Sequence, residues 1–177
     1  MFNLVNYTQL LQNVTDAVGA NPKGDAFEAA CSYLFSELDG VLIEGRDSSM
    51  AAEEIDIVLW NAQIEESLKP FDYTILVECK NWTKPADAKA LDSFIGKVRR
   101  RDLKTGIFIA ANGVTGDFLN ADNGAGAIEI IKGALQEGIR VIIINEEDLR
   151  AITTIDDFRK LIRKRFCGLF IHKLFNN

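Results

Sequence analysis

The chain has 177 residues, of which 47% are hydrophobic and 26% are charged, proportions that are ordinary for a globular domain long enough to bury a core. No apolar run approaches the length that spans a bilayer, and no basic segment followed by an apolar stretch opens the chain, so we expect no membrane contact and no secretory signal. The single histidine and the three widely spaced cysteines argue against a zinc site and favour a reducing cytoplasm.

The net charge of −6 is unevenly distributed along the chain. From Phe158 onward there are six Lys or Arg residues and no Asp or Glu, so the preceding residues carry 14 basic and 26 acidic side chains. Affinity for phosphate depends on contacts from Lys and Arg, and an acidic body therefore argues against nucleic-acid binding unless a few bases cluster locally.

Two helices are predicted at the start of the chain. A loose stripe of apolar side chains predicts a helix over residues 2–18, and the segment Asn21-Pro22-Lys23-Gly24 is expected to break it. We expect Asp25 to cap the second helix, with Glu28 three residues later as in a capping box, and Asp39-Gly40 to end it.

The middle of the chain changes from strands alone to strands that alternate with helices. Strands are predicted at 41–45, 53–60 and 72–79, and their links are too short for crossover helices, which favours an antiparallel meander. The later predicted elements are a helix at 86–103, a strand at 106–110, a helix at 118–137, a strand at 139–145, a short helix at 146–151 and a basic helix from 155. Alternation of this kind indicates parallel pairing, so we expect an α/β fold with a mixed central sheet flanked by helices.

We expect a single domain over 1–177, because no repeat and no linker rich in Pro, Gly or Ser interrupts the chain. Residues 1–22 would form an N-terminal helical extension, 24–150 the core, and 155–177 a basic C-terminal helix. The segment Phe158 to Phe166 is basic and amphipathic. It is typical of a helix that docks on its own domain and turns its bases toward a substrate, with membrane-surface association as the alternative.

Two of the predicted strands carry acids inside apolar segments. Asp56 lies within 53–60, and Glu78 lies within 73–80 and is followed two residues later by Lys80. Because side chains alternate along a strand, Glu78 and Lys80 share a face, and pairing of the two strands would bring Asp56 beside them. Two carboxylates and one ammonium at one point can hold a divalent cation. The alternative is an exposed ion pair worth about 0–1 kcal/mol.

These residues, in their order along the chain, resemble the PD-(D/E)XK nuclease superfamily, and more closely its Mrr-like restriction endonuclease domains. The similarity rests on Phe27-Glu28, Glu54-Ile55-Asp56-Ile57, Glu78-Cys79-Lys80 and Gly106 to Gly113. It implies a restriction-endonuclease-like αβββαβ core and a Mg²⁺ (or Mn²⁺) ion held by Asp56, Glu78 and the backbone carbonyl of Cys79. It also implies Lys80 as a catalytic lysine and Glu28 as an acid that reaches the site from the first core helix.

A group of basic residues crowds the end of the helix that follows the site: Lys97, Arg99, Arg100, Arg101 and Lys104. In a nuclease of this kind they would contact the phosphate backbone of nucleic acid. The alternative is that they complement the dipole of the helix C-terminus.

The expected function is that of a metal-dependent endonuclease that hydrolyses phosphodiester bonds in DNA. An RNA-cleaving effector of the same fold and a non-catalytic module that binds nucleic acid or protein remain as alternatives. The acidic body favours a recognition-subunit partner, and a double-strand cut would need two active sites and hence a homodimer.

Overall fold

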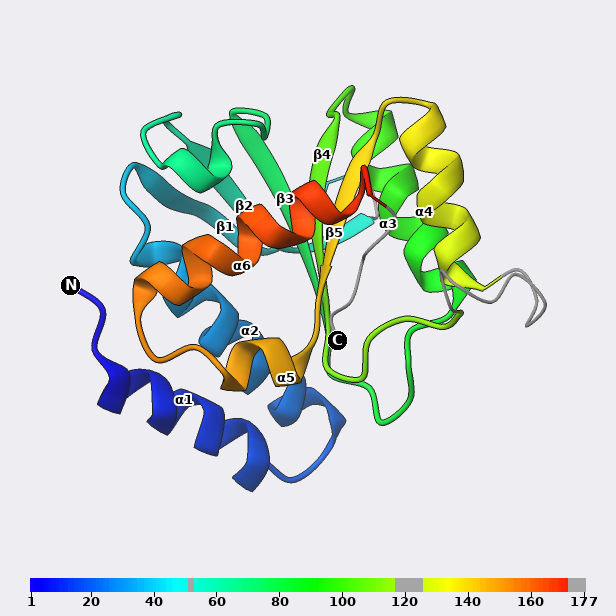
Figure 1. The fold of residues 1–177 in the computed structure, drawn as a ribbon. Coiled ribbons are helices and arrows are strands. Elements are labelled where there is room, and N and C mark those ends of the chain that lie inside the picture. Colours follow the sequence, from blue (N-terminus) through cyan, green and yellow to red (C-terminus); the bar gives the residue numbers. More distant parts are fainter. Residues whose placement is uncertain (51–52, 117–125, 172–177) are drawn as a thin grey trace.

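The computed structural model describes residues 1–50, 53–116 and 126–171, without the side chains of residues 46–50 and 53. A single five-stranded sheet runs through the molecule and helices cover both of its faces (Figure 1). The predicted α/β architecture with a mixed sheet is therefore confirmed.

The sheet has strand order β1-β2-β3-β4-β5. Its first three strands, β1 (Val41–Met50), β2 (Glu53–Asn61) and β3 (Thr74–Lys80), form the antiparallel meander that the short links predict. The strands β4 (Thr105–Ala110) and β5 (Arg140–Ile144) then add in parallel. The crossovers carry the helices α3 (Ala88–Arg100) and α4 (Ala127–Gln136).

The two halves of the sheet differ in how they are covered. Every residue of β4 is buried, as expected for a parallel strand with helices on both sides. On β2 only one face belongs to the core, where Ile57 and Leu59 are fully buried, whereas Trp60 on the other face is 42% exposed. The β1–β2 half of the sheet therefore keeps a face that is partly open to solvent.

The helices divide between the two faces. On one face lie α2 (Ala20–Ser36) and α6 (Ile155–Gly168), whose side chains Phe35 and Phe158 meet edge to face at 5.2 Å. The helix α1 (Leu4–Asp16) packs on α2, and Tyr7 donates a hydrogen bond from its hydroxyl to the carbonyl of Leu149, in α5 (Glu146–Arg150). On the other face α3 and α4 cover β4 and β5. A short 3-10 helix, η1 (Glu66–Leu68), joins β2 to β3.

Gly106 sets how closely α3 approaches the sheet. A Cβ atom at this position would lie 3.0 Å from Phe94 and 3.1 Å from Val98, both on α3. The missing side chain lets the helix lie against β4, and this approach fixes the height of the other α3 side chains above β3.

The predicted start of the second helix is wrong. The helix α2 begins at Ala20, so Pro22 lies in its first turn and Asp25 lies inside it. Proline is tolerated in a first turn because the amide hydrogen that it lacks has no intrahelical partner there. The N-cap is Gly19, which makes no side-chain hydrogen bond, so the predicted capping box at Asp25 is also wrong.

The larger of the other differences concern three boundaries. The strand β1 continues to Met50, well past residue 45, as one arm of a long hairpin with β2. The helix expected at 118–137 is described only from Ala127, and 117–125 lie outside the described residues. The basic helix expected over 155–177 ends at Gly168, and 172–177 also lie outside the description.

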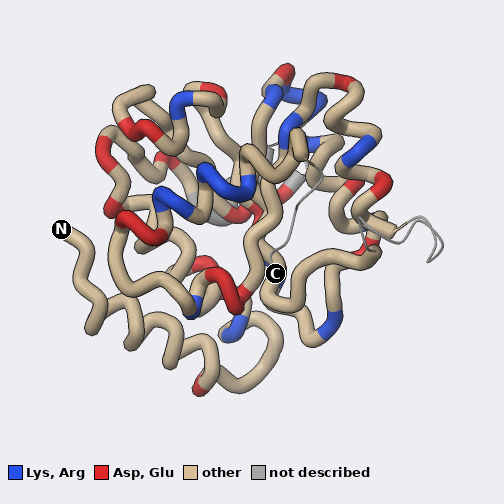
Figure 2. The backbone as a smooth tube through the Cα atoms, viewed as in Figure 1, with Lys and Arg blue, Asp and Glu red and all other residues tan. Residues whose placement is uncertain are grey.

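The C-terminal helix docks on its own domain, as predicted. Its apolar side, with Phe158 and Ile162, is buried. Its bases, however, meet acids of the same domain: Arg159 pairs with Glu65 at 2.9 Å and Arg165 pairs with Asp148 at 2.6 Å. Figure 2 shows basic positions along α6, with acidic positions on neighbouring parts of the chain. Arg165 is buried, so the expectation that α6 turns its bases toward a substrate is wrong for this residue.

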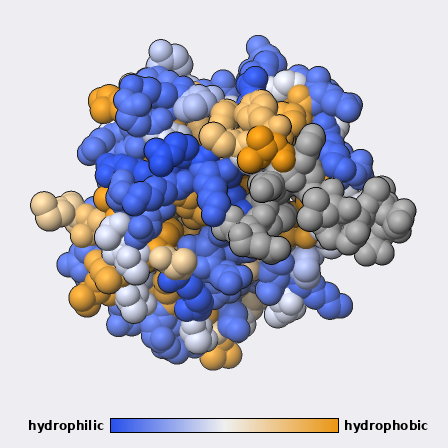
Figure 3. Space-filling model, in the orientation of Figure 1, coloured by the Kyte–Doolittle hydropathy of each residue, from blue (hydrophilic) through white to orange (hydrophobic). Residues whose placement is uncertain are grey.

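An apolar area lies over the end of α6 (Figure 3). Phe166 contacts both Phe71 and Phe170, at 5.2 and 5.7 Å between ring centroids, while Phe170 and Ile171 remain more than half exposed. Across the described ranges, no helix is long and apolar enough to cross a membrane.

Candidate active site

Asp56 and Glu78 lie side by side on neighbouring strands. The antiparallel register pairs Ile57 with Val77, and the next position places Asp56 opposite Glu78. Both are buried, with 6% and 5% of their surfaces exposed. Burial of two acids is costly without compensating charges and hydrogen bonds, so their partners determine what this site can do.

The carboxylate of Asp56 takes the place of a backbone partner at the end of the β2–β3 ladder. Continuing the register would pair Cys79 with Ile55, but the amide of Cys79 donates to Oδ2 of Asp56 at 2.6 Å. Burial, and next the charge of Glu78, raise the pKa of the Asp56 carboxyl, while the charge of Lys80 opposes them. The two acids therefore repel one another in a space that favours a cation between them.

Two lysines compensate Glu78. Lys80 Nζ lies 2.7 Å from Oε1, and Lys97 Nζ lies 2.7 Å from Oε2. Lys80 also lies 3.5 Å from Oδ2 of Asp56. The site is thus a nearly buried group of two carboxylates and two ammonium groups, with formal charges that balance.

The pKa of Lys80 reflects a competition. Burial acts to lower it, but the charges of Glu78 and Asp56 outweigh burial and raise the pKa above its ordinary value. The neighbouring acids thus determine the protonation state of Lys80, which carries its proton at neutral pH. Lys80 is therefore suited to stabilise negative charge.

Lys97 is a site residue that sequence reasoning placed elsewhere. The sequence predicts Lys97 as one of the bases that contact the phosphate backbone, but it is only 9% exposed and points from α3 to Glu78. One signal was available in the sequence: Lys97 lies three residues after Phe94 and one before Val98, and both are in the core. A lysine on the apolar side of a helix needs an acid as partner, and the acid is on the strand beneath.

The other bases of the predicted cluster gather at the end of α3. Arg99 and Lys104 form surface ion pairs with Glu137 and Asp102. Arg101 is half-buried and donates to the carbonyl of Lys97. Arg100 is exposed, and its guanidinium lies over Gly96. The exposed part of the cluster is therefore one turn away from the lysine that enters the site.

Glu28 approaches from the opposite face. It is half-buried on α2 and lies close enough to Cys79 to affect the thiol. The pKa of Cys79 is raised by its contact with the Cys31 thiol and by burial, and to a smaller degree by the charges of Asp56 and Glu28. Glu28 therefore acts on the end of β3 from α2, whereas Lys97 reaches Glu78 from α3.

The donor set suits a hard divalent cation. Asp56 and Glu78 supply carboxylate oxygens, and Mg²⁺ typically takes one or two carboxylates together with water and phosphate oxygens. The carbonyl of Cys79 points to the β2 side, because a strand residue directs its amide and carbonyl to the same neighbour and the amide binds Asp56. Within the described part of the chain, no group of three or more His, Cys, Asp or Glu side chains assembles in a metal-holding arrangement. Asp56 and Glu78 are the two carboxylates that the paired strands bring together here.

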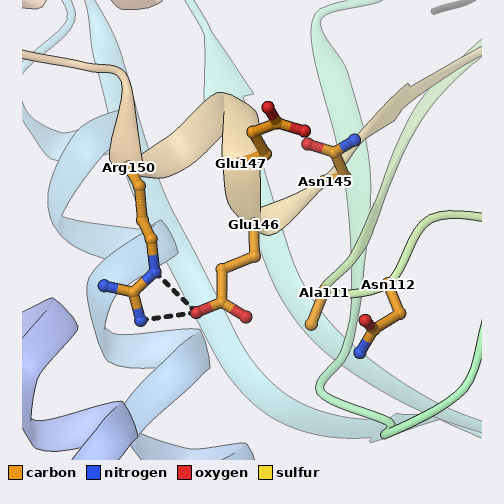
Figure 4. A pocket seen from close by; sticks show the side chains of 6 residues that line it. All are labelled: Ala111, Asn112, Asn145, Glu146, Glu147 and Arg150. Atoms are coloured by element: carbon orange, nitrogen blue, oxygen red, sulfur yellow. Dashed lines mark hydrogen bonds and ion pairs between the residues drawn. The ribbon is translucent and has the colours of Figure 1, made fainter.

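A separate pocket lies beyond the carboxyl ends of β4 and β5 (Figure 4). It is a cavity of about 450 Å³ lined by Ala111, Asn112, Asn145, Glu146, Glu147 and Arg150. It adjoins the end of β3, since Ala111 donates to the carbonyl of Lys80 and Asn112 to that of Trp82. Glu146 holds Arg150 at 2.8 Å. With its cation paired and a second acid beside it, this pocket is poorly suited to phosphate.

The comparisons with known proteins agree with this geometry. A family model described as a restriction endonuclease, Mrr_cat, matches residues 20–151, a span that contains Asp56, Glu78, Lys80 and Lys97. Among curated proteins, no sequence matches the chain.

Proposed function

The chain belongs to the Mrr_cat restriction-endonuclease family, within the PD-(D/E)XK superfamily, and from this premise we propose that it is a divalent-metal-dependent endonuclease that hydrolyses phosphodiester bonds in DNA. The observation that carries the proposal is the convergence of Asp56, Glu78 and Lys80 at the end of two paired strands. An exposed ion pair, the alternative for these residues, is inconsistent with the burial of both acids.

Asp56 and Glu78, with the carbonyl of Cys79, would hold a Mg²⁺ or Mn²⁺ ion. When bound, such an ion supplies a nucleophilic water near neutral pH and stabilises charge on the phosphate. Lys80 reaches both carboxylates, so its ammonium is placed to orient the attacking water and to neutralise charge that develops on the phosphate.

Lys97 supplies a second ammonium from α3. It holds the Glu78 oxygen that Lys80 does not hold, and so it fixes the orientation of the carboxylate that would bind the ion. We assign it a positioning role in the same reaction, and Glu28 a supporting role from the opposite side of the sheet.

Cleavage assays with matched variants test the proposal. Supercoiled plasmid, single-stranded DNA and RNA are each incubated with the protein and Mg²⁺ or Mn²⁺, alongside Asp56→Ala and Lys80→Ala. We expect DNA cleavage that each substitution reduces by at least about 100-fold, since the loss of even one preorganised hydrogen-bond donor to a transition state typically costs about 2.7–4 kcal/mol. The matched control is Glu54→Ala, which removes an exposed acid from the same strand and should leave the rate unchanged.

The same assays decide between the alternatives. Cleavage that survives both substitutions would contradict the site assignment. Cleavage of RNA alone would make the protein an RNA-cleaving effector. Absence of cleavage together with absence of Mn²⁺ binding by calorimetry would favour a non-catalytic module. A double-strand cut needs two sites, and we propose that a homodimer or a recognition-subunit partner provides the second site or the specificity.

A further inference from the structure

An exposed aromatic pair lies on the sheet close to the candidate active site. The rings of Trp60 and Tyr73 stack with centroids 5.8 Å apart and an interplanar angle of 26°. Trp60 is 42% exposed and Tyr73 is 61% exposed, and the neighbouring Leu42 on β1 is 57% exposed. Contiguous exposed apolar side chains are typical of surfaces that bind a ligand or a partner.

The pair lies on the same face as the catalytic acids. Along β2 the core face is formed by Ile57 and Leu59, and the opposite face carries Asp56, then Val58, then Trp60. Exposure increases along this row: Asp56 is buried, Val58 is half-buried and Trp60 is open. Four residues of a strand span roughly 13 Å, at about 3.3 Å for each residue. The aromatic pair is thus within reach of the nucleotides that flank a phosphate at Asp56.

The basic end of α3 lies beside the pair. Asp72, the residue before Tyr73, accepts hydrogen bonds from the amides of Lys104 and Thr105, each at 2.7 Å. These bonds tie the start of β3 to the loop that follows the exposed Arg99 and Arg100. The loop after α3, the stacked aromatic rings and the candidate metal site therefore belong to neighbouring elements of the same sheet.

The arrangement selects for one kind of ligand. Inside a duplex the faces of paired bases are covered by their neighbours, so a ring face stacks on a base that is unpaired or at the end of a helix. The two rings are too close together to admit a base between them, so a base would stack on an outer face of the pair. Stacking adds affinity that does not depend on phosphate contacts, which suits a chain with a net charge of −6.

We infer that Trp60 and Tyr73 bind an unpaired base of the nucleic-acid substrate, next to the phosphate that is cleaved. The inference rests on the proposed nuclease function and narrows its substrate to nucleic acid with an unpaired base near the cut: a single strand, a frayed end or a flipped nucleotide.

Binding measured without cleavage tests the inference. The chain has two tryptophans, so in a Trp82→Phe background Trp60 is the sole indole. In EDTA, a short single-stranded oligonucleotide should quench its fluorescence, and a blunt duplex of the same sequence should quench it far less. By fluorescence anisotropy, Trp60→Ala and Tyr73→Ala should each weaken single-strand binding about tenfold, whereas Tyr73→Phe retains it. The control Val5→Ala, an exposed apolar residue on α1, should bind like the parent.

Several results would overturn the inference. One is the absence of quenching, and another is single-strand binding that Trp60→Ala leaves unchanged while its melting temperature matches the parent. A third is a dimer, seen by light scattering, that Trp60→Ala dissociates while oligonucleotide binding persists, because the pair would then be a contact between two copies. Quenching that persists in a protein unable to cut any nucleic acid would refute the nuclease function but not the stacking site.

Discussion

Glu78 is held between two ammonium groups, with Lys80 at one carboxylate oxygen and Lys97 at the other. A divalent cation at this carboxylate must share it with both lysines. Because Lys97 comes from a different element, it can be removed without changing either strand of the site. Replacing Lys97 therefore tests whether a lysine competes with the metal ion for Glu78, while both candidate metal ligands stay in place.

Lys97→Met should lower stability in EDTA and increase stabilisation by metal. The variant leaves Glu78 buried with one ammonium in place of two, and breaking a buried pair costs up to about 3–5 kcal/mol. Mn²⁺ no longer competes with Lys97 for the carboxylate, so its binding should raise the melting temperature more in the variant than in the parent. Thermal melts over a Mn²⁺ titration measure both effects.

The matched control is Lys104→Met, whose ammonium makes an exposed pair with Asp102. It should melt like the parent at every Mn²⁺ concentration, because exposed pairs contribute about 0–1 kcal/mol. A Mn²⁺ shift in Lys97→Met that equals the shift in the parent would contradict the competition between Lys97 and the ion.

At the scale of elements, the site depends on how closely α3 lies on the sheet. Gly106 has no side chain between β4 and α3, and a Cβ there would already press on Phe94 and Val98. Larger groups must therefore push the helix outward or distort its side chains. Lys97 moves with α3, so the distance between Lys97 and Glu78 responds to a substitution on a strand that carries no site residue.

Gly106→Val should destabilise the fold by about 1–3 kcal/mol, the usual cost of an overpacked core, and should reduce cleavage beyond the effect of stability alone. Chemical denaturation gives the first quantity, and cleavage rates well below the melting temperature give the second. Gly133→Ala is the control, since its Cβ would meet nothing within 4 Å and alanine favours a helix by about 1 kcal/mol. Normal cleavage by a folded Gly106→Val protein would show that the cleavage rate does not depend on how closely α3 lies on the sheet.

The elements that are specified by their own local residue pattern were predictable from sequence. The buried runs of β4 and β5 and the short links of the meander specify a mixed sheet locally, and this sheet is confirmed. The start of α2 was not predictable, because Pro22 is compatible both with a helix end and with a first turn. The place of Lys97 depends on Glu78, which is 19 residues away across the α3–β3 contact. Helical periodicity alone does not distinguish such a lysine from one that snorkels to solvent.

At the scale of the whole molecule, the hydrophobic core includes residues that lie outside the part of the chain matched by the family model. The match covers residues 20–151, but Tyr7 and Phe158, on either side of that span, are each 1% exposed or less and belong to the same core cluster. Arg165 of α6 is 4% exposed at its side chain and pairs with Asp148 of α5, inside the matched span. We therefore propose that α1 and α6 belong to one folding unit with the catalytic core.

A fragment that contains only residues 20–151 should fail to fold cooperatively. Loss of α6 uncovers Phe35 and leaves Asp148 without Arg165, a nearly buried acid that has lost its charge partner. Circular dichroism melts of the fragment and the full chain test this expectation. Within the full chain, Arg165→Met should cost about 3–5 kcal/mol, while Arg163→Met, an exposed residue on the same helix, should stay within about 0.5 kcal/mol. A fragment that melts as sharply as the full chain would show that α1 and α6 are not needed for cooperative folding. The basic helix α6 would then be available to contact the substrate, as its composition indicates.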